Sequence, residues 1–229
     1  MKIHESAFDF RIKTRKDLVN AVREFGFVPL FRNSIPGFSV EEHVDPRVWF
    51  TGEEGVWEWK GPVIRETGAA YGKFFEHKAV FISPEWFPDF ADYRRDGYDF
   101  DARFDDELAS FKDKYLFDLV DGHAPVLSKT LKELGDYRKG GRIGFDTVMN
   151  RLQAQCYVVI SNFVYETDRF GNRYGWGVAE YSTPEKLTGK SFTEKVYQRT
   201  PEESYERVFQ HLKSLLPGTD DATIRRILK

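Results

Sequence analysis

Two glutamines separated by one residue, Gln153 and Gln155, are the first feature of this sequence that could do chemistry. A pair of side-chain amides can hold a water molecule or the edge of a base, because each amide both donates and accepts hydrogen bonds. In an extended segment the two side chains would face the same way, whereas in a helix they would diverge by about 200°. The structural alternative is two polar residues at a helix end, one capping the helix and one in solvent.

A run of carboxylates behind two arginines is the second feature. Clustered carboxylates can bind Mg²⁺ or Ca²⁺, or act as acid and base. Their spacing lacks the order of an EF-hand calcium loop, and rings alternate with carboxylates from Tyr98 to Asp101. The alternation favours rings that point inward and carboxylates that point outward, where they can pair with the arginines. We therefore expect a polar cluster of structural character, without a metal or other cofactor, at Arg94, Arg95, Asp99 and Asp101.

Several other kinds of site are excluded by what the sequence lacks. The five histidines do not have metalloprotease spacing, and there is neither a nucleophile elbow nor a phosphate-binding P-loop. The single cysteine excludes an internal disulfide and zinc sites that need two or more cysteines. Because Cys156 borders an apolar strand, we expect it to be packed and unreactive.

The elements that must position these residues follow from hydrophobic periodicity and capping residues. In the first half they are a helix from Thr14 that Gly26 ends, a tryptophan-rich loop over residues 45–59, a hairpin over 70–83 and a helix over 85–95. In the second half they are helices over 105–120, 128–134 and 145–155, strands over 157–165 and 174–181, and helices from Pro201 and Asp221. Helix, short helix, helix, strand, turn and strand is the order of a winged helix.

We therefore expect an α+β fold, in which an N-terminal half of helices and a β-hairpin packs against a winged-helix C-terminal half. The expected parts are residues 1–104 and 105–229, and together they should form one compact unit. The chain has 229 residues, of which 16% are aromatic, and most of these rings fall on the apolar stripes of the expected elements. The aromatic excess is thus assigned mainly to the core.

Charge is divided unevenly between the two halves. The net charge is −3, but residues 1–120 hold 17 basic and 23 acidic side chains, and residues 121–229 hold 17 and 14. The total argues against a strongly cationic nucleic-acid coat or a polybasic membrane module. The basic share lies on the expected winged helix, whose third helix enters the major groove while wing cations contact phosphates. The candidate nucleic-acid-binding residues, for which a solvated surface is the alternative, are Lys129, Lys132, Arg138, Lys139, Arg142, Arg151, Arg169 and Arg173.

Five short strings occur in order along the chain: Pro36–Ser39, Tyr71–Phe75, Tyr93–Asp101, Leu152–Gln155 and Tyr174–Trp176. With these strings the chain resembles, over nearly its whole length, an uncharacterised bacterial family described as AlkZ-related. That description points to winged-helix DNA glycosylases, which excise alkylated or cross-linked purines. The resemblance implies tandem winged-helix motifs and a catalytic Gln-x-Gln or Gln-x-Asp, and Gln153 and Gln155 are the only residues with that spacing.

The first functional hypothesis is a winged-helix DNA-binding protein, a DNA-repair glycosylase relative acting on damaged bases, in which Gln153 and Gln155 position water or the lesion. The alternative is a non-enzymatic module that uses the winged-helix fold for protein contacts. A weaker third hypothesis has Asp99 and Asp101 hold a metal for hydrolysis.

The sequence also bears on location and partners. Residues 1–10 lack the uninterrupted apolar core of a secretory signal. The longest uncharged, mostly apolar stretch, residues 156–165, is about half the length of a membrane span. We expect a cytoplasmic protein with DNA as its partner and no membrane contact, and its oligomeric state stays open.

Overall fold

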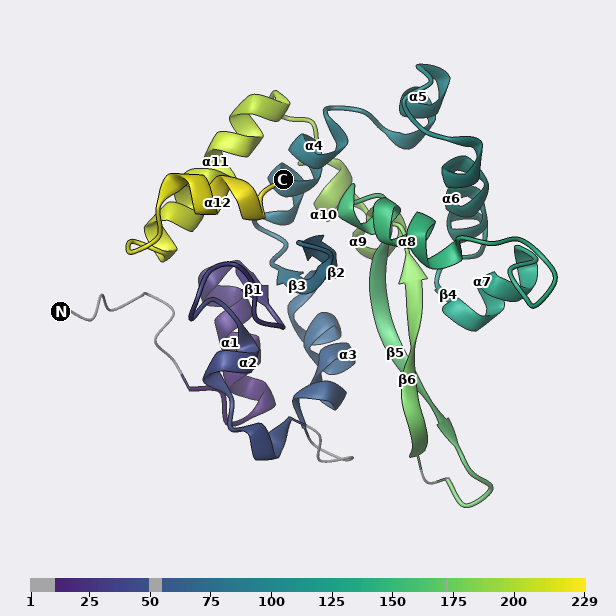
Figure 1. The fold of residues 1–229 in the computed structure, drawn as a ribbon, viewed down its shortest axis with the longest axis horizontal. Coiled ribbons are helices and arrows are strands. Elements are labelled where there is room, and N and C mark those ends of the chain that lie inside the picture. Colours follow the sequence, from purple (N-terminus) through teal and green to yellow (C-terminus); the bar gives the residue numbers. More distant parts are fainter. Residues whose placement is uncertain (1–10, 50–54, 172) are drawn as a thin grey trace.

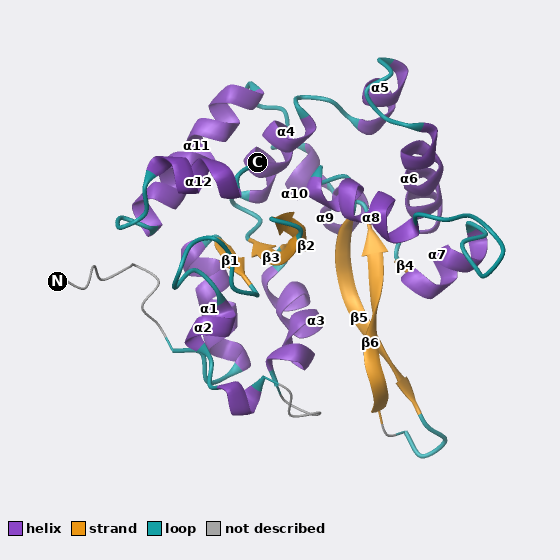
Figure 2. Cartoon of the chain, in the orientation of Figure 1, coloured by secondary structure: helices purple, strands orange, loops and turns teal. Residues whose placement is uncertain are grey.

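The computed structural model describes residues 11–49, 55–171 and 173–229, which form helices and two three-stranded antiparallel sheets (Figure 1, Figure 2). The expected α+β class is thereby confirmed. The predictions for residues 1–10, for the middle of the tryptophan-rich loop and for Asn172 in the expected turn lie outside the described residues. Within the described ranges, no helix has the length and apolar character needed to cross a membrane.

The first sheet belongs to a unit in which a helix, a strand, further helices and a pair of strands follow one another. Its elements are α1 (Arg15–Phe25), β1 (Phe27–Pro29), α2 (Val40–His43), the 3-10 helix η1 (Pro46–Val48), α3 (Val56–Thr67), β2 (Ala70–Phe75) and β3 (Lys78–Ile82). The strand order is β1-β3-β2. Glu76 and His77 turn the β2–β3 hairpin with φ of 48° and 59°, the left-handed values that a two-residue hairpin loop favours.

The second sheet belongs to a unit with the same order of elements. These are α6 (Phe111–His123), β4 (Val126–Leu127), α7 (Ser128–Leu134), α8 (Phe145–Ala154), β5 (Val159–Thr167) and β6 (Arg173–Ser182). The strand order is β4-β6-β5. In both sheets, therefore, the last strand of the unit lies between the other two. The far end of the β5–β6 hairpin extends beyond the rest of the molecule in the view of Figure 1.

The remaining helices lie between or after the two units in the sequence. They are α4 (Phe87–Arg95), α5 (Phe100–Asp105), α9 (Pro184–Thr188), α10 (Lys190–Thr193), α11 (Pro201–Leu215) and α12 (Asp221–Ile227). On α11, His211 Nε2 donates a 2.8 Å hydrogen bond to the Phe25 carbonyl, and the ring stacks on Trp86 at 3.9 Å. Buried residues of α11 and α12 complete the core of the first unit, so this core draws on both sides of residue 104. A smaller core lies among α6, α7 and α8.

Capping residues explain where several helices begin. Thr14 caps α1 and Thr200 caps α11, each in a reciprocal capping box with the acidic residue three positions later, as such a spacing predicts. Ser110 forms the same kind of box with Asp113 at the start of α6. The cap at Ser110 explains why the expected helix over 105–120 is wrong: the chain forms α5, a short link and then α6.

The expected loop over 45–59 is also wrong at its end, because α3 begins at Val56. A helix over 105–120 would place Leu108 and Phe111 on its apolar stripe, but these residues are 50% and 84% exposed. The hairpin over 70–83 and the helices from Thr14, Ser128, Pro201 and Asp221 are confirmed.

Candidate functional site

A cleft lies between α3 of the first unit and β5 of the second, which run side by side in Figure 1. Gly61 permits their close approach, because a Cβ at this position would lie 2.8 Å from Asn162 Oδ1 and 3.4 Å from the backbone nitrogen of Phe163. The Arg65 guanidinium donates to the same Asn162 oxygen. Glycine within a helix is unfavourable by about 1 kcal/mol relative to alanine, and here the contact between the two units accounts for it.

Lys60 is a buried cation at this contact, with only 3% of the residue exposed. Its ammonium nitrogen lies 3.3 Å from the centroid of the Trp57 ring and 4.1 Å from that of Phe163 on β5. In the described part of the chain, Lys60 has these rings and no ion pair or hydrogen bond. Burial lowers the pKa of Lys60 to about 7, and Glu58 acts in the opposite direction.

Two oxygens of residues that line the cleft are buried without a hydrogen-bond partner in the described residues, Glu58 Oε2 and the Tyr165 hydroxyl. Pro62 has no N–H, so the backbone carbonyl of Glu58 also lacks the donor that an α-helix would supply four residues later. Burial, and after it the charge of Glu58, raises the pKa of Tyr165, so the phenol keeps its proton at neutral pH. Unsatisfied buried polar atoms are rare in folded proteins and need a physical explanation.

Cations and rings line the rim of the cleft. Arg65 and Arg173 both line it, and the Arg173 guanidinium lies 5.4 Å from the centroid of the Tyr165 ring. Trp176 on β6, which is 67% exposed, meets Trp57 edge-on at 5.6 Å between ring centroids. The cleft therefore combines the carboxyl group of Glu58 and the phenol of Tyr165 with two guanidinium groups and the ring of Phe163. Such a set can exchange protons and hold a planar or anionic group.

We expect Gly61→Ala to lower the free energy of unfolding, although alanine is the better helix former. The added methyl group would meet the Asn162 amide at 2.8 Å, and over-packing of this kind costs about 1–3 kcal/mol. Gly122, near the end of α6, is the matched control because a Cβ there would meet nothing within 4 Å. Gly122→Ala should stabilise the protein by about 0.5–1 kcal/mol. Urea denaturation measures both, and equal stabilisation by the two changes would contradict the close contact.

The predicted glutamine pair is divided by the helix in which it lies. Gln153 is 1% exposed; its Oε1 accepts from the Lys73 backbone at 3.3 Å, and its Nε2 donates to the Met149 carbonyl at 3.3 Å. Gln153 thus ties α8 to β2 of the first unit. Gln155 follows the last turn of α8 and is partly exposed. The next residue, Cys156, is buried, and burial raises its pKa to about 12, so the expectation that it is packed is confirmed.

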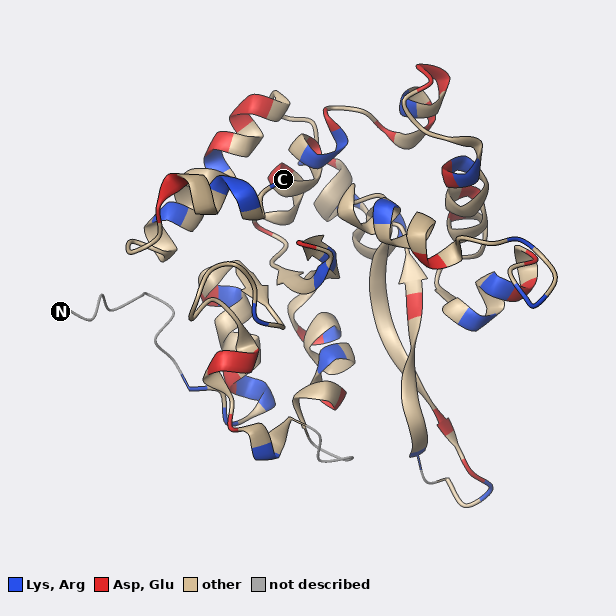
Figure 3. Cartoon of the chain, in the orientation of Figure 1, with Lys and Arg blue, Asp and Glu red and all other residues tan. Residues whose placement is uncertain are grey.

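Half of the predicted nucleic-acid-binding cations are paired with carboxylates of the same chain. The ion pairs are Lys129–Glu166, Lys132–Asp146, Arg138–Glu133 and Arg151–Asp113. Figure 3 accordingly shows acidic segments beside basic ones on α7 and along the hairpin.

The other predicted cations have no carboxylate partner among the described residues. The guanidinium groups of Arg142, Arg169 and Arg173 lie over the rings of Tyr115, Phe170 and Tyr165. Lys139 has no partner in the part of the chain that the structure describes, and it is exposed.

The predicted cluster at Arg94, Arg95, Asp99 and Asp101 does not come together. Arg94 donates to the backbone carbonyls of Phe74 and Lys229. Arg95, which is 1% exposed, reaches Glu185 instead. Asp99 caps α5, and Asp101 pairs with Lys114 at 3.4 Å. Among the described residues, no group of three or more His, Cys, Asp or Glu side chains could hold a metal ion.

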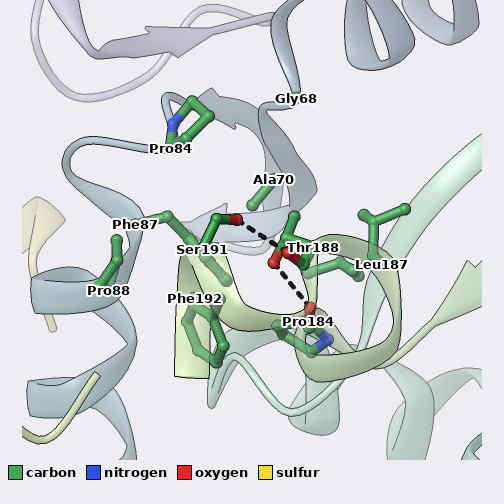
Figure 4. A pocket seen from close by; sticks show the side chains of 11 residues that line it. Gly68, Ala70, Pro84, Phe87, Pro88, Pro184, Leu187, Thr188, Ser191 and Phe192 are labelled. Carbon is green, nitrogen blue, oxygen red and sulfur yellow. Dashed lines mark hydrogen bonds between the residues drawn. The ribbon is translucent and has the colours of Figure 1, made fainter. Parts of the chain in front are cut away.

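A second hollow, between β2, α4 and the α9–α10 segment, offers little chemistry. Its lining is apolar apart from two hydroxyls, and Figure 4 shows both already bonded. Thr188 Oγ1 donates to the Pro184 carbonyl and Ser191 Oγ to the Thr188 carbonyl, each at 2.8 Å. The cleft between α3 and β5 is therefore the stronger candidate site.

Lys60, Glu58 and Tyr165 are not among the residues predicted from the sequence. One signal for Lys60 was present. Once α3 is assigned, Val56, Lys60 and Val63 fall on one face at helical spacing, which places a lysine within an apolar stripe. No comparable signal links α3 to Tyr165, which lies about a hundred residues later in the chain.

The fold and the site define an α+β protein of two units with one common order of elements and a polar, ring-lined cleft between them. A model of the family described as AlkZ related matches residues 12–229. The chain belongs to the AlkZ-related family. Comparisons with curated proteins and with solved structures return no match.

Proposed function

We propose that this chain is a DNA-binding protein of two winged-helix units that takes part in the repair of damaged bases. The order of elements supports the fold, because each unit has helix, strand, helices and two strands, with the last strand in the middle of the sheet. Membership of the AlkZ-related family supports the role in repair. Winged-helix units most often bind DNA, and cations on the hairpin and on one helix make the contacts.

The observation that carries the proposal is the exposed end of the β5–β6 hairpin. Phe170, Tyr174 and Trp176 are 72%, 53% and 67% exposed there. Arg169 and Arg173 flank them and have no carboxylate partner in the described residues. Aromatic rings stack on bases, and guanidinium groups bind phosphates. Exposed rings of this size are unfavourable in water unless they meet a partner.

We expect fluorescence anisotropy to detect binding to duplex DNA at about 50 mM salt and a steep loss of affinity by about 200 mM. The double variant Arg169→Ala with Arg173→Ala removes two phosphate contacts. It should weaken binding and make the slope of log K against log salt shallower by about 2. Lys213→Ala serves as the control, because Lys213 pairs with Asp221 on the helices at the other end of the molecule. Absence of duplex binding at the low salt concentration would refute the proposal.

If the protein excises a base, Gln153 and Gln155 have different roles in the reaction. Gln155 is partly exposed at the end of α8 and could contact a lesion or a water molecule without any rearrangement. Gln153 would first have to release the two hydrogen bonds that join it to Lys73 and Met149. We therefore propose that Gln155 is the member of the pair that acts at the substrate, while Gln153 holds α8 against β2.

A protein-binding module is the second candidate, and one observation favours it. Phe111 and Ile143 are 84% and 82% exposed, and Arg142, which precedes Ile143, lies over Tyr115, one turn along α6 from Phe111. Large apolar side chains exposed together often mark protein interfaces. The anisotropy titration separates the two functions, since a protein-binding module would show no salt-sensitive affinity for duplex DNA.

A further inference from the structure

The cleft between α3 and β5 has polar side chains on both walls and a volume of about 430 Å³. Small-molecule sites usually have volumes of about 300–1,000 Å³. On α3 the lining residues are Glu58, Pro62 and Arg65, whose helical spacing places them on one face of the helix. The opposite wall belongs to the β5–β6 hairpin (Figure 1). A ligand in the cleft would therefore contact both units.

Two groups that line the cleft lack hydrogen-bond partners in the described residues. They are the carboxylate oxygen Oε2 of Glu58 and the hydroxyl of Tyr165, and both atoms are buried. A carboxylate oxygen accepts hydrogen bonds, whereas a phenol can donate one. Buried polar groups in folded proteins are nearly always paired. An unused acceptor and an unused donor in one cleft therefore indicate a ligand that offers the complementary pair.

The Tyr165 ring is positioned by its own hairpin. It lies across Gly177 of β6, where a Cβ would stand 2.8 Å from the ring carbon Cζ. Because both buried oxygens are covered, a side chain must turn before a ligand reaches them. The Arg173 guanidinium lies 5.4 Å from the centroid of the Tyr165 ring, and Arg173 is exposed. It has no carboxylate partner in the described residues, so it can turn without breaking an ion pair.

Two guanidinium groups at the cleft suit an anion. Arg65 donates to Asn162 Oδ1 and keeps further N–H groups for a ligand, because a guanidinium has five. In the part of the chain that the structure describes, Glu58 forms no ion pair with Arg65 or Arg173, although all three line the cleft. The carboxylate and the guanidinium groups are thus left for different parts of one ligand. Guanidinium groups match the geometry of phosphate oxygens.

Phe163 supplies an apolar surface for a planar group. Its ring lines the cleft and packs against two buried neighbours, the Lys60 ammonium at 4.1 Å from the ring centroid and the Tyr71 ring edge-on at 5.8 Å. These contacts hold the ring in place. Aromatic side chains stack on nucleobases, so the cleft offers a surface for a base, a polar pair for its edge and cations for a phosphate.

We propose that the cleft binds a nucleotide whose base has an amino group next to an unprotonated ring nitrogen on its Watson–Crick edge. Adenine and cytosine have this edge, whereas the corresponding ring nitrogen of guanine, thymine or uracil carries a hydrogen. The amino group donates to Glu58 Oε2, and the Tyr165 hydroxyl donates to the ring nitrogen. The phosphate contacts Arg65 and Arg173.

The proposal goes beyond duplex binding, because both strands of a duplex use this edge for base pairing. The ligand is therefore a free nucleotide or an unpaired base of a strand. Proteins that bind an unpaired base commonly contact it by hydrogen bonds to the same edge.

The test is isothermal titration calorimetry of the full-length protein with the 5′-monophosphates of adenosine, cytidine, guanosine and uridine. We expect the adenosine and cytidine nucleotides to bind. The guanosine and uridine nucleotides should bind at least about tenfold more weakly, because they leave buried polar groups unpaired. Single-stranded oligonucleotides of adenine or of thymine form a second series, which separates a free nucleotide from a base within a strand.

Tyr165→Phe removes the donor and should weaken the binding of adenosine monophosphate about tenfold. Because the hydroxyl has no partner in the described residues, this change should not lower the free energy of unfolding measured by urea denaturation. Tyr205→Phe is the matched control, since Tyr205 lies on α11 and does not line the cleft, and it should leave the affinity unchanged. A structural role of the Tyr165 hydroxyl would instead lower stability and leave the affinity as it was.

Each outcome decides between the alternatives. Equal affinity for the four nucleotides, or an affinity for adenosine monophosphate and the adenine oligonucleotide that Tyr165→Phe does not change, overturns the proposal. Binding of the adenine oligonucleotide alone, weakened by Tyr165→Phe, assigns the site to an unpaired base in a strand.

The nucleotide site and the proposed function fail separately. If no nucleotide and no oligonucleotide binds at the cleft but anisotropy detects duplex binding, the nucleotide site is refuted and the proposed function stands. If adenosine monophosphate binds and the duplex does not, the nucleotide site stands and the proposed function is refuted.

Discussion

Replacement of Arg95 by methionine is expected to lower the free energy of unfolding by about 3 kcal/mol. Arg95 is 1% exposed and donates to Glu185 at 2.6 Å, to the Tyr197 hydroxyl at 2.9 Å and to the Cys156 carbonyl at 2.8 Å. Its guanidinium also lies 4.7 Å from the centroid of the Tyr157 ring. One side chain thus joins α4 to α9 and to the segment that precedes β5.

The stability is lost mainly because some hydrogen-bond partners of Arg95 remain buried after the substitution and cannot bind water instead. The Glu185 side chain is 39% exposed and can be solvated again, but the Cys156 carbonyl would lose a charged donor in a buried setting. Hydrogen bonds to charged groups contribute about 1.5–3 kcal/mol each, and methionine fills only part of the space.

Urea denaturation followed by circular dichroism measures this effect. Arg138→Met is the matched control, because Arg138 pairs with Glu133 where both side chains are more than half exposed. Exposed ion pairs contribute about 0–1 kcal/mol, so the control should change little. If Arg95→Met and Arg138→Met have equal effects, Arg95 does not act as a buried tie between α4, α9 and the segment before β5.

Lys60→Met is expected to stabilise the protein, and by an amount that depends on pH. The pKa of Lys60 is lowered to about 7 in the folded chain, from 10.5 for the unperturbed group. Below pH 7 both states carry the charge, and the folded state bears the full penalty of burying it. The gain from methionine should be on the order of 3 kcal/mol at pH 6.

The sign of the pH dependence follows from proton uptake. Between pH 7 and 10.5 the unfolded chain keeps a proton at Lys60 that the folded chain has released, so the wild-type protein gains stability as pH rises. The advantage of Lys60→Met therefore shrinks by about 1.4 kcal/mol per pH unit above 7.

Urea denaturation of the wild type and of Lys60→Met at pH 6, 7.5 and 9 measures the difference in the free energy of unfolding. Lys73→Met is the control, and its effect on this free energy should be the same at all three pH values. A difference between wild type and Lys60→Met that does not change over this range would show that the amine is not desolvated.

Local signals predicted much of the secondary structure. Thr14 and Gly26 mark the ends of α1, and Thr200 with Pro201 marks the start of α11, because caps depend on residues that are neighbours in sequence. The short strands β1 and β4 were not expected. Each has only two or three residues, and pairing with a distant strand, more than their own composition, makes them extended.

The candidate site was less accessible to sequence reasoning than the fold. Composition places Lys129 and Arg151 on a basic half, but it does not reveal that Glu166 and Asp113 neutralise them. The apolar stripe of α3 places Lys60 among buried residues, but it does not reveal that Phe163, about a hundred residues away, packs over the amine. Contacts between residues so far apart in the sequence depend on how the two units associate, and no local sequence pattern specifies that association.

The way α11 and α12 close the core of the first unit also bears on how the protein is made. A ribosome adds roughly 5–20 residues per second, so the chain from Ile82 to Pro201 takes roughly 6–24 s to synthesise. Throughout that interval the apolar residues that face Val208, Leu212 and Ile224 in the finished protein remain uncovered. Nascent chains with such open surfaces are prone to aggregate and are bound by chaperones. Ample chaperone during synthesis should therefore favour the yield of folded protein.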